Sequence, residues 1–159
     1  MTTVMERPRA ARAGTSASQE YVTLTVANQL CGIPVLTVRD ILGPQQVTRV
    51  PLAPPEVAGS LNLRGRIVTA IDLRRRLGLA PAEQGARPMS VVVEAMGEFY
   101  SLLVDQVGEV LALEDEAREA NPPTLDPRWR SVSLGVHRLQ GQLMVVLDVE
   151  RVLDLGTGI

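Results

Sequence analysis

Lysine is missing from the chain, and aromatic side chains nearly so. All 16 basic residues are arginines, and the aromatic residues are one Trp, one Phe and two Tyr. Surfaces that stack nucleic-acid bases need several aromatic side chains, and phosphate binding needs a wide basic face. The net charge is −2 and the one basic run, Arg74 to Arg76, is short, so the composition argues against nucleic acid as a partner. We expect this run to form the solvated face of a helix.

Cysteine and histidine each occur once, as Cys31 and His137. A single cysteine cannot form an internal disulfide, and one cysteine with one histidine is too few for a zinc site. Neither residue stands in a nucleophile motif, and the sequence has no glycine-rich phosphate loop. We therefore expect both side chains to be structural, with no metal and no cofactor, and the cysteine count fits a reducing cytosol.

Long apolar runs are also missing. No window approaches the ~20 uninterrupted apolar residues of a membrane-spanning helix. The first 18 residues lack the apolar stretch of a secretory signal. The sequence therefore predicts no membrane insertion. We expect residues 1–18 to form a disordered tail and residues 19–159 to form a single domain.

The apolar residues that are present follow the period of β-strands. Residues 20–35 alternate around a turn at residues 27–29, residues 36–42 continue the alternation, and the pattern starts again over residues 89–113. This period, with many β-branched residues, predicts strands joined by tight turns. The expected fold class is therefore mainly β.

Short helices are predicted at two places in the first half. The leucines and arginines of residues 73–79 are spaced as in one or two helical turns, which Gly78 would end. The proline-rich residues 51–60 predict a second short helix, with Pro54 or Pro55 in its first turn and Gly59 at its end.

The chain contains one motif twice. Residues 62–73 read NLRGRIVTAIDL, and residues 138–149 read RLQGQLMVVLDV. When Gly65 is placed on Gly141, the glycine, the apolar run and the closing aspartate coincide. A duplicated structural unit explains this repetition without any shared chemistry.

A second pair of segments completes the duplication. Residues 29–42 match residues 98–111 in their apolar positions, so the chain holds two units in the same order, at about 20–85 and 89–155. Units this small, with four or five strands each, bury too little apolar surface alone, and closing each sheet into a barrel removes its edges. We expect two packed, intertwined barrels with a binding groove between them.

Each copy of the motif ends in an aspartate, Asp72 or Asp148. Two symmetric carboxylates could share a proton, as in aspartic proteases, which are also duplicated β-barrels. Leu73 and Val149 follow the aspartates, where that site needs a small hydroxyl residue and glycine. The favoured interpretation is that each aspartate caps the helix after it. The alternative is a duplicated-barrel aspartic hydrolase.

Two other residues leave alternatives open. Arg64 lies in a tight turn where packing does not require a guanidinium, so it is either a solvated arginine or a ligand for a partner's carboxylate. Trp129 is either a core residue or an interface anchor.

Taken together, the motifs resemble those of CheW-like domains, the adaptor modules of bacterial chemosensory arrays. The resemblance covers residues 20–155. It rests on Gly59, on NLRGRIV (62–68) and IDLR (71–74), and on the flanking motifs CGIPV (31–35), VRDI (38–41), VTRVP (47–51) and LLVD (102–105).

The resemblance implies two five-stranded SH3-like β-barrel subdomains around a hydrophobic groove, without catalysis. It implies a cytoplasmic adaptor that couples chemoreceptors to the histidine kinase CheA in arrays at the inner face of the membrane. The implied partners are the cytoplasmic hairpin tip of the receptors, the regulatory (P5) domain of CheA, and other CheW-like domains in rings.

The resemblance also assigns roles to single residues. It places Val38, Asp40, Val107 and Val110 in the receptor-binding groove, where apolar side chains would receive a helix and the carboxylate would meet a basic or polar receptor residue.

Gly59 and Arg64 match positions that matter for receptor or kinase coupling. Residues 114–130 depart from the best-known adaptors in a region that can contact the kinase, and Trp129 in that segment is a candidate kinase contact. The kinase partner is therefore left open, and an adaptor of a non-flagellar pathway, for surface motility or gene regulation, is the alternative.

Overall fold

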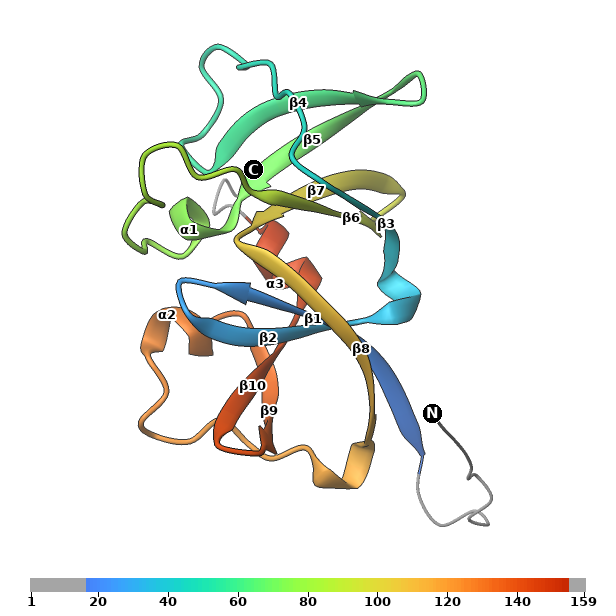
Figure 1. Cartoon of the computed structure of the whole chain (residues 1–159), viewed down its shortest axis with the longest axis vertical. Coiled ribbons are helices and arrows are strands. Elements are labelled where there is room, and N and C mark those ends of the chain that lie inside the picture. Colours follow the sequence, from blue (N-terminus) through green and yellow to red (C-terminus); the bar gives the residue numbers. More distant parts are fainter. Residues whose placement is uncertain (1–16, 155–159) are drawn as a thin grey trace.

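The structure is a computed structural model that describes residues 17–154. The tail expected over residues 1–18 lies outside the described residues except for its last two, and Ser18 already begins the first strand. Within the described part, ten strands alternate with three helices of about one turn and two 3₁₀ turns (Figure 1).

The strands are β1 (Ser18–Val26), β2 (Gln29–Pro34), β3 (Val38–Leu42), β4 (Val57–Leu63), β5 (Arg66–Asp72), β6 (Met89–Ala95), β7 (Glu98–Val104), β8 (Gln106–Glu114), β9 (Ser133–Leu139) and β10 (Gln142–Leu147). The helices are α1 (Leu73–Arg76), α2 (Pro127–Arg130) and α3 (Val149–Leu153), and the 3₁₀ turns are η3 (Val35–Thr37) and η4 (Asp115–Ala117).

The ten strands form two five-stranded sheets. Sheet A has the order β8-β1-β2-β10-β9, and sheet B has the order β3-β6-β7-β5-β4. Strands β1 to β5 correspond in order to strands β6 to β10. When each strand is exchanged for its counterpart, the order of one sheet becomes the order of the other, so the two sheets have the same topology. The prediction of a mainly β fold built from two repeated five-stranded units is confirmed.

Each sheet draws strands from both halves of the chain. The hairpin β1–β2 belongs to sheet A, whereas β3, β4 and β5 of the same half belong to sheet B. Two parallel pairings, β2 with β10 and β5 with β7, join the halves inside the sheets. The two halves have therefore exchanged their first hairpins, so neither sheet can form without residues from both.

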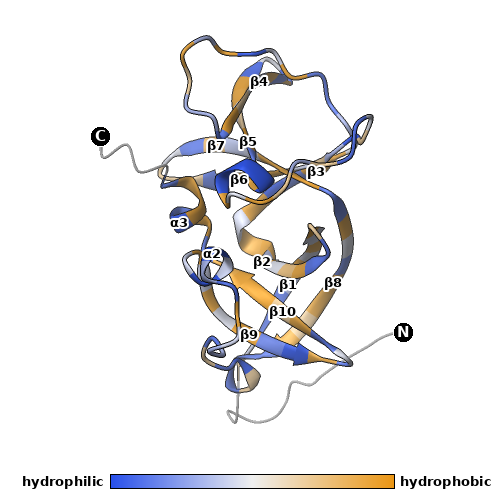
Figure 2. Cartoon of the chain, turned by 90° about the vertical axis from the view of Figure 1, so that its left-hand side faces the viewer, coloured by the Kyte–Doolittle hydropathy of each residue, from blue (hydrophilic) through white to orange (hydrophobic). Residues whose placement is uncertain are grey.

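A single main core extends over both sheets. Strands of sheet A contribute fully buried residues such as Leu24 and Ile33, and strands of sheet B contribute Ile71 and Leu102 to the same cluster. β10 is apolar along most of its length in Figure 2, and its residues 144–147 are all buried. Because the core is shared, a displacement of one sheet is expected to be felt by the other.

The helix expected at residues 51–60 is not present. Residues 57–63 instead form β4, and Gly59 lies inside this strand rather than at a helix end. Ser60 and Thr48 exchange two backbone hydrogen bonds of 2.7 Å, which hold the preceding loop against β4. The prolines therefore shape a loop before a strand, and the segment between β3 and β4 is irregular.

A half-buried ion pair connects the two sheets. Asp105, directly after β7, accepts hydrogen bonds of 3.1 and 2.7 Å from Nε and Nη2 of Arg74 in α1. The same carboxylate accepts a 2.8 Å bond from the backbone N–H of Ala27, in the β1–β2 turn of sheet A. Asp105 therefore ties a turn of one sheet to the helix that follows β5 of the other.

The run Arg74 to Arg76 is thus not the solvated helix face that its sequence suggests. Besides Arg74, the Arg76 guanidinium donates to the carbonyl oxygens of Arg151, Val152 and Asp154 at the end of α3, at 2.7 to 3.1 Å. A cation at this place satisfies carbonyl groups that the short helix leaves unpaired.

We expect Asp105→Asn to lower the free energy of unfolding by about 2 kcal/mol at neutral pH, because it breaks a charge-assisted pair. The Arg74 hydrogen bonds hold the pKa of Asp105 below its usual range. A lowered folded-state pKa gives stability that is complete above the unfolded-state pKa, near ~4, and is lost as the pH falls through the folded-state pKa.

Urea unfolding of the wild type and the variant at pH 7 and in acid measures this difference. Glu94→Gln, which breaks the exposed Arg39–Glu94 pair, is the control and should cost little at either pH. A gap between Asp105→Asn and the wild type that stays constant into acid would contradict the assignment.

Candidate functional site: two edge strands joined by an arginine

The residues expected in the receptor-binding groove lie on two edge strands. Val38 and Asp40 belong to β3, one of the two edge strands of sheet B. Val107 and Val110 belong to β8, one of the two edge strands of sheet A. These strands are counterparts in the repeat. They lie on the same side of the molecule, on the right in Figure 2.

The side chains of this surface have graded exposure. Val38 and Val107 are half-buried and pack against the main core, whereas Val110 is 51% exposed. The pairing of each edge strand has a register shift beside these residues, between Val38 and Asp40 in β3 and opposite Val107 and Val110 in β8. Such irregularities change the direction in which side chains point and limit the pairing of a further strand with this edge. Side-chain docking therefore suits this surface better than simple strand addition.

Arg64 lies at the tip of the β4–β5 hairpin in a strained conformation. Leu63 pairs with Arg66, so the loop is Arg64-Gly65, with φ values of 52° and 83°. Two successive positive φ angles define a type I′ turn, whose first position favours Asn, Asp or Gly. The Asn62 side chain stabilises the turn by accepting a 2.9 Å hydrogen bond from the N–H of Gly65. An arginine there carries a backbone cost that packing does not explain.

The structure brings Arg64 and Asp40 together. Nη1 of Arg64 lies 3.0 Å from Oδ2 of Asp40, while Oδ1 of Asp40 accepts a 2.9 Å bond from the N–H of Ile41. The arginine side chain is 76% exposed and the aspartate 23%. The carboxylate expected to face a receptor residue thus already has a basic partner within the chain, and that partner presents most of its surface to solvent.

The second repeat lacks this arrangement. Gln140 replaces Arg64 in the equivalent turn, and there only Gly141 has a positive φ. Glu109, the counterpart of Asp40, has no ion pair within residues 17–154. The ion pair therefore distinguishes two otherwise equivalent edges, and it marks the β3 edge as the specialised one.

Two exposed apolar residues beside these positions were not predicted. Leu36, in the 3₁₀ turn before β3, is 82% exposed, and Ile41 in β3 is 39% exposed. Ile41 is the repeat counterpart of Val110, so the duplication contained a signal for it. Leu36 and Ile41 extend the apolar part of the surface formed by the two edge strands. We call this surface the β3–β8 surface and define it as Leu36, Val38, Asp40, Ile41, Val107 and Val110.

The two symmetric aspartates are helix caps. Asp72 accepts backbone hydrogen bonds of 2.9 and 3.3 Å at the start of α1, and Asp148 accepts bonds of 3.1 and 3.3 Å at the start of α3. Each also lies near an arginine of its own helix, Arg75 or Arg151. The capping prediction is confirmed, and the hydrolase alternative receives no support because each carboxylate is used in its own cap.

We expect Asp72→Ala and Asp148→Ala each to cost about 1 kcal/mol of unfolding free energy, and the double variant to cost their sum. Asn retains a capping oxygen, so the Asn variants should lose less. Urea unfolding of the five variants measures both effects. A double variant far from additive would indicate that the two carboxylates interact after all.

The remaining candidates have structural positions. Trp129 is 5% exposed and packs in the main core, which fits the core alternative, and we do not propose a kinase contact through its indole. Burial raises the pKa of the Cys31 thiol and lowers the pKa of His137, which favours the neutral form of each. Across residues 17–154, no three His, Cys, Asp or Glu side chains are arranged to hold a metal ion.

Gly59 is required by backbone packing. Its φ is 152°, and a Cβ at this position would collide with the carbonyl oxygen of Thr48 and lie 2.7 Å from Cγ1 of Val47. Gly135, its counterpart, has a φ of 141°, and a Cβ there would lie 2.7 Å from the carbonyl oxygen of Glu119. The two glycines thus hold the same loop-to-strand bridge in each repeat.

Comparison with known proteins identifies the family of the chain. The CheW-like domain family matches residues 20–156. The chain belongs to the CheW-like family. It is 29% identical over 143 residues to the chemotaxis protein CheW of Rhizobium meliloti, covering 90% of this chain and 92% of that one. It is 30% identical over 142 residues to the chemotaxis protein CheW of Klebsiella aerogenes, covering 89% and 86%.

A solved CheW-like structure has the same fold. The scaffolding protein TtCheW from Thermoanaerobacter tengcongensis superposes with a TM-score of 0.73 at 26% identity, over 82% of this chain and 89% of that one. CheW-like proteins are scaffold proteins of chemotaxis and not enzymes. No helix within residues 17–154 is long and apolar enough to cross a membrane.

Proposed function

We propose that this CheW-like protein couples chemoreceptors to the histidine kinase CheA through protein contacts alone, in cytoplasmic arrays at the inner face of the membrane. The relatives from Rhizobium and Klebsiella are named chemotaxis proteins, and the relative from Thermoanaerobacter is called a scaffolding protein. The observation that carries the proposal is the Arg64–Asp40 ion pair beside the apolar side chains of the β3–β8 surface.

The β3–β8 surface fits the hairpin tip of a receptor. A helix docks by placing apolar side chains against an apolar surface and polar ones at its rim. Val38, Val107 and the more exposed Ile41 and Val110 supply the apolar surface. The Arg64 guanidinium, held by Asp40 with most of its surface in water, can bind a receptor carboxylate or carbonyl oxygen.

Coupling to the kinase would use the shared core. A receptor that moves against β3 and β8 acts on the edges of both sheets at once. Asp105, paired with Arg74 of α1 and bonded to the N–H of Ala27 in the β1–β2 turn, links the same two sheets. The regulatory domain of CheA would bind to this chain and respond to the resulting change in sheet packing. Residues 114–130 remain our candidate for the surface that selects the kinase, through their exposed side chains rather than Trp129.

A reconstituted signalling assay tests the proposal. The chain is titrated into a soluble receptor signalling domain and CheA, and kinase activity and co-sedimentation are measured with each component left out in turn. We expect kinase activity to depend on receptor only when the chain is present. Normal folding by circular dichroism with no binding to receptor or kinase would refute the proposal.

A further inference from the structure

The loop between β3 and β4 presents a leucine in an unusual backbone conformation. Residues 50–53 form a β-turn in which the N–H of Ala53 donates to the carbonyl oxygen of Val50 at 3.4 Å. Pro51 occupies the second position and Leu52, with a φ of 64°, the third. This is the pattern of a type II turn, whose third position normally holds glycine or asparagine.

Leu52 also gains nothing from burial, since it is 102% exposed. A branched aliphatic residue in the left-handed region is strained, and its complete exposure to water adds no compensating apolar contact. Glycine would relieve the strain at no loss of packing. A leucine at such a place points to a contact with another molecule.

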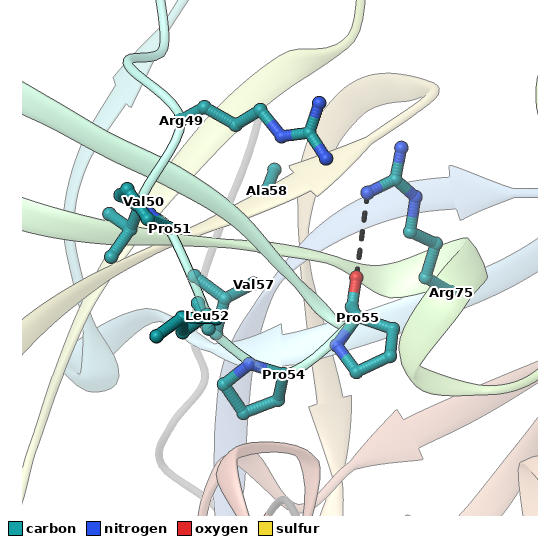
Figure 3. A pocket seen from close by; sticks show the side chains of 10 residues that line it. Arg49, Val50, Pro51, Leu52, Pro54, Pro55, Val57, Ala58 and Arg75 are labelled. Carbon is teal, nitrogen blue, oxygen red and sulfur yellow. Dashed lines mark hydrogen bonds between the residues drawn. The ribbon is translucent and has the colours of Figure 1, made fainter.

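Beside this turn lies a hollow of about 320 Å³. Its apolar lining includes Val50, Leu52, Pro54, Val57 and Ala58. Arg49 and Arg75 also line the hollow, and in Figure 3 both guanidinium groups are drawn on the side away from Val50 and Leu52.

The two arginines keep hydrogen-bonding capacity for a ligand. Arg49 is exposed and has no hydrogen bond or ion pair within residues 17–154. Arg75 makes only long contacts, 3.4 Å from Nη1 to the carbonyl oxygen of Pro55 and 3.6 Å from Nε to Asp72. Two guanidinium groups beside an apolar wall match a ligand that combines a carboxylate with an aliphatic side chain.

We propose that this hollow binds an acidic segment of a partner protein, with an aliphatic side chain against Leu52 and a carboxylate between Arg49 and Arg75. The two arginines give the hollow a positive charge that suits an acidic ligand. A peptide is favoured over nucleic acid because the wall offers no aromatic ring on which a base could stack. The site contains no residue of the β3–β8 surface and does not contain Arg64, so it is independent of the coupling function proposed above.

Fluorescence polarisation with the full chain tests the proposal, with a labelled twelve-residue peptide of alternating leucine and glutamate as the probe. We expect saturable binding and about a tenfold loss of affinity when the glutamates are replaced by glutamine. Arg49→Ala and Arg75→Ala should each weaken binding by about tenfold for the same reason.

Leu52→Gly separates binding from folding. It should melt no lower than the wild type, because it relieves the positive φ, yet bind the peptide about tenfold more weakly. Met96→Gly is the matched control, since Met96 is also an exposed apolar residue with a positive φ (54°), in the β6–β7 turn. Arg138→Ala is the control for charge, and both controls should leave binding unchanged.

Three results would overturn the proposal. The first is the absence of saturable binding by the wild type. The second is equal binding by Leu52→Gly or by the glutamine peptide. The third is a different occupant: self-association in sedimentation velocity, or binding to phosphatidylserine vesicles, that depends on Arg49 and Leu52 while the peptide does not bind.

Discussion

Replacing Gly59 by alanine is expected to lower the free energy of unfolding by roughly 4 kcal/mol, enough to unfold much of the population of a marginally stable domain. Two effects add here. The backbone at this position has a φ of 152°, and a Cβ would meet the Thr48 carbonyl oxygen that bridges to Ser60. Neither β4 nor the loop at Thr48 can move away from the added Cβ without breaking the hydrogen bonds between Thr48 and Ser60.

Gly65→Ala is the matched control. Gly65 also has a positive φ, 83°, but a Cβ there would meet nothing within 4 Å. Its cost should be limited to the conformational term, about 1–2 kcal/mol. Gly135→Ala should resemble Gly59→Ala, because its bridge to Glu119 is equivalent. Urea unfolding of the three variants measures the differences, and equal losses at Gly59 and Gly65 would show that the collision is relieved cheaply.

This prediction changes what a coupling defect at Gly59 would mean. The resemblance to CheW-like domains assigned the position to receptor or kinase coupling, and the structure supplies a folding reason for its sensitivity. We propose that Gly59 acts by keeping residues 47–48 against β4. Coupling assays on Gly59→Ala should therefore be normalised to the folded fraction, and activity per folded molecule should stay near that of the wild type.

The strands could be predicted because their signal is local. Alternation of apolar residues fixes which face of a strand is buried, and the repeat showed that the pattern occurs twice. Strand exchange between the halves was an expectation without a partner assignment. The pairing of β2 with β10 depends on contacts between residues more than 110 positions apart, such as Cys31 and Val145, and no local pattern encodes such a pairing.

The errors arose where long-range partners decide the conformation. The prolines of residues 51–60 suggested a helix, but the bridge between Thr48 and Ser60 places that backbone in an extended strand. Arg74 and Arg76 looked solvated because their partners, Asp105 and the end of α3, are distant in sequence. Helix α2 was missed although Asp126-Pro127 is a typical helix start, with the aspartate as the cap.

The candidate site was predicted residue by residue but not as a geometry. The resemblance named both Asp40 and Arg64, and nothing in the sequence indicated that one would hold the other. Their contact requires the β4–β5 hairpin, at one edge of sheet B, to meet β3 at the other edge, which is a property of the folded sheet.

Arg64→Ala is expected to weaken the apparent affinity of the receptor–kinase complex by about tenfold while changing the free energy of unfolding by less than ~1 kcal/mol. The ion pair is too exposed to contribute much stability, so loss of coupling without loss of folding would identify Arg64 as a contact residue. Gln140→Ala, in the equivalent turn of the second repeat, is the control and should leave both quantities unchanged. Titration of the reconstituted receptor and kinase gives the affinity, and urea unfolding gives the stability.

The double variant Asp40→Arg with Arg64→Asp decides what the ion pair does. If its only role is to fix the hairpin tip to β3, the exchanged pair should restore coupling that each single variant loses. If Arg64 also binds a receptor carboxylate, the exchange places a negative charge at the exposed position and coupling should stay low. We expect the second result, because Arg64 keeps 76% of its surface in water after pairing with Asp40. Full restoration would instead make the arginine a positioning residue and leave the apolar side chains of the β3–β8 surface as the receptor contacts.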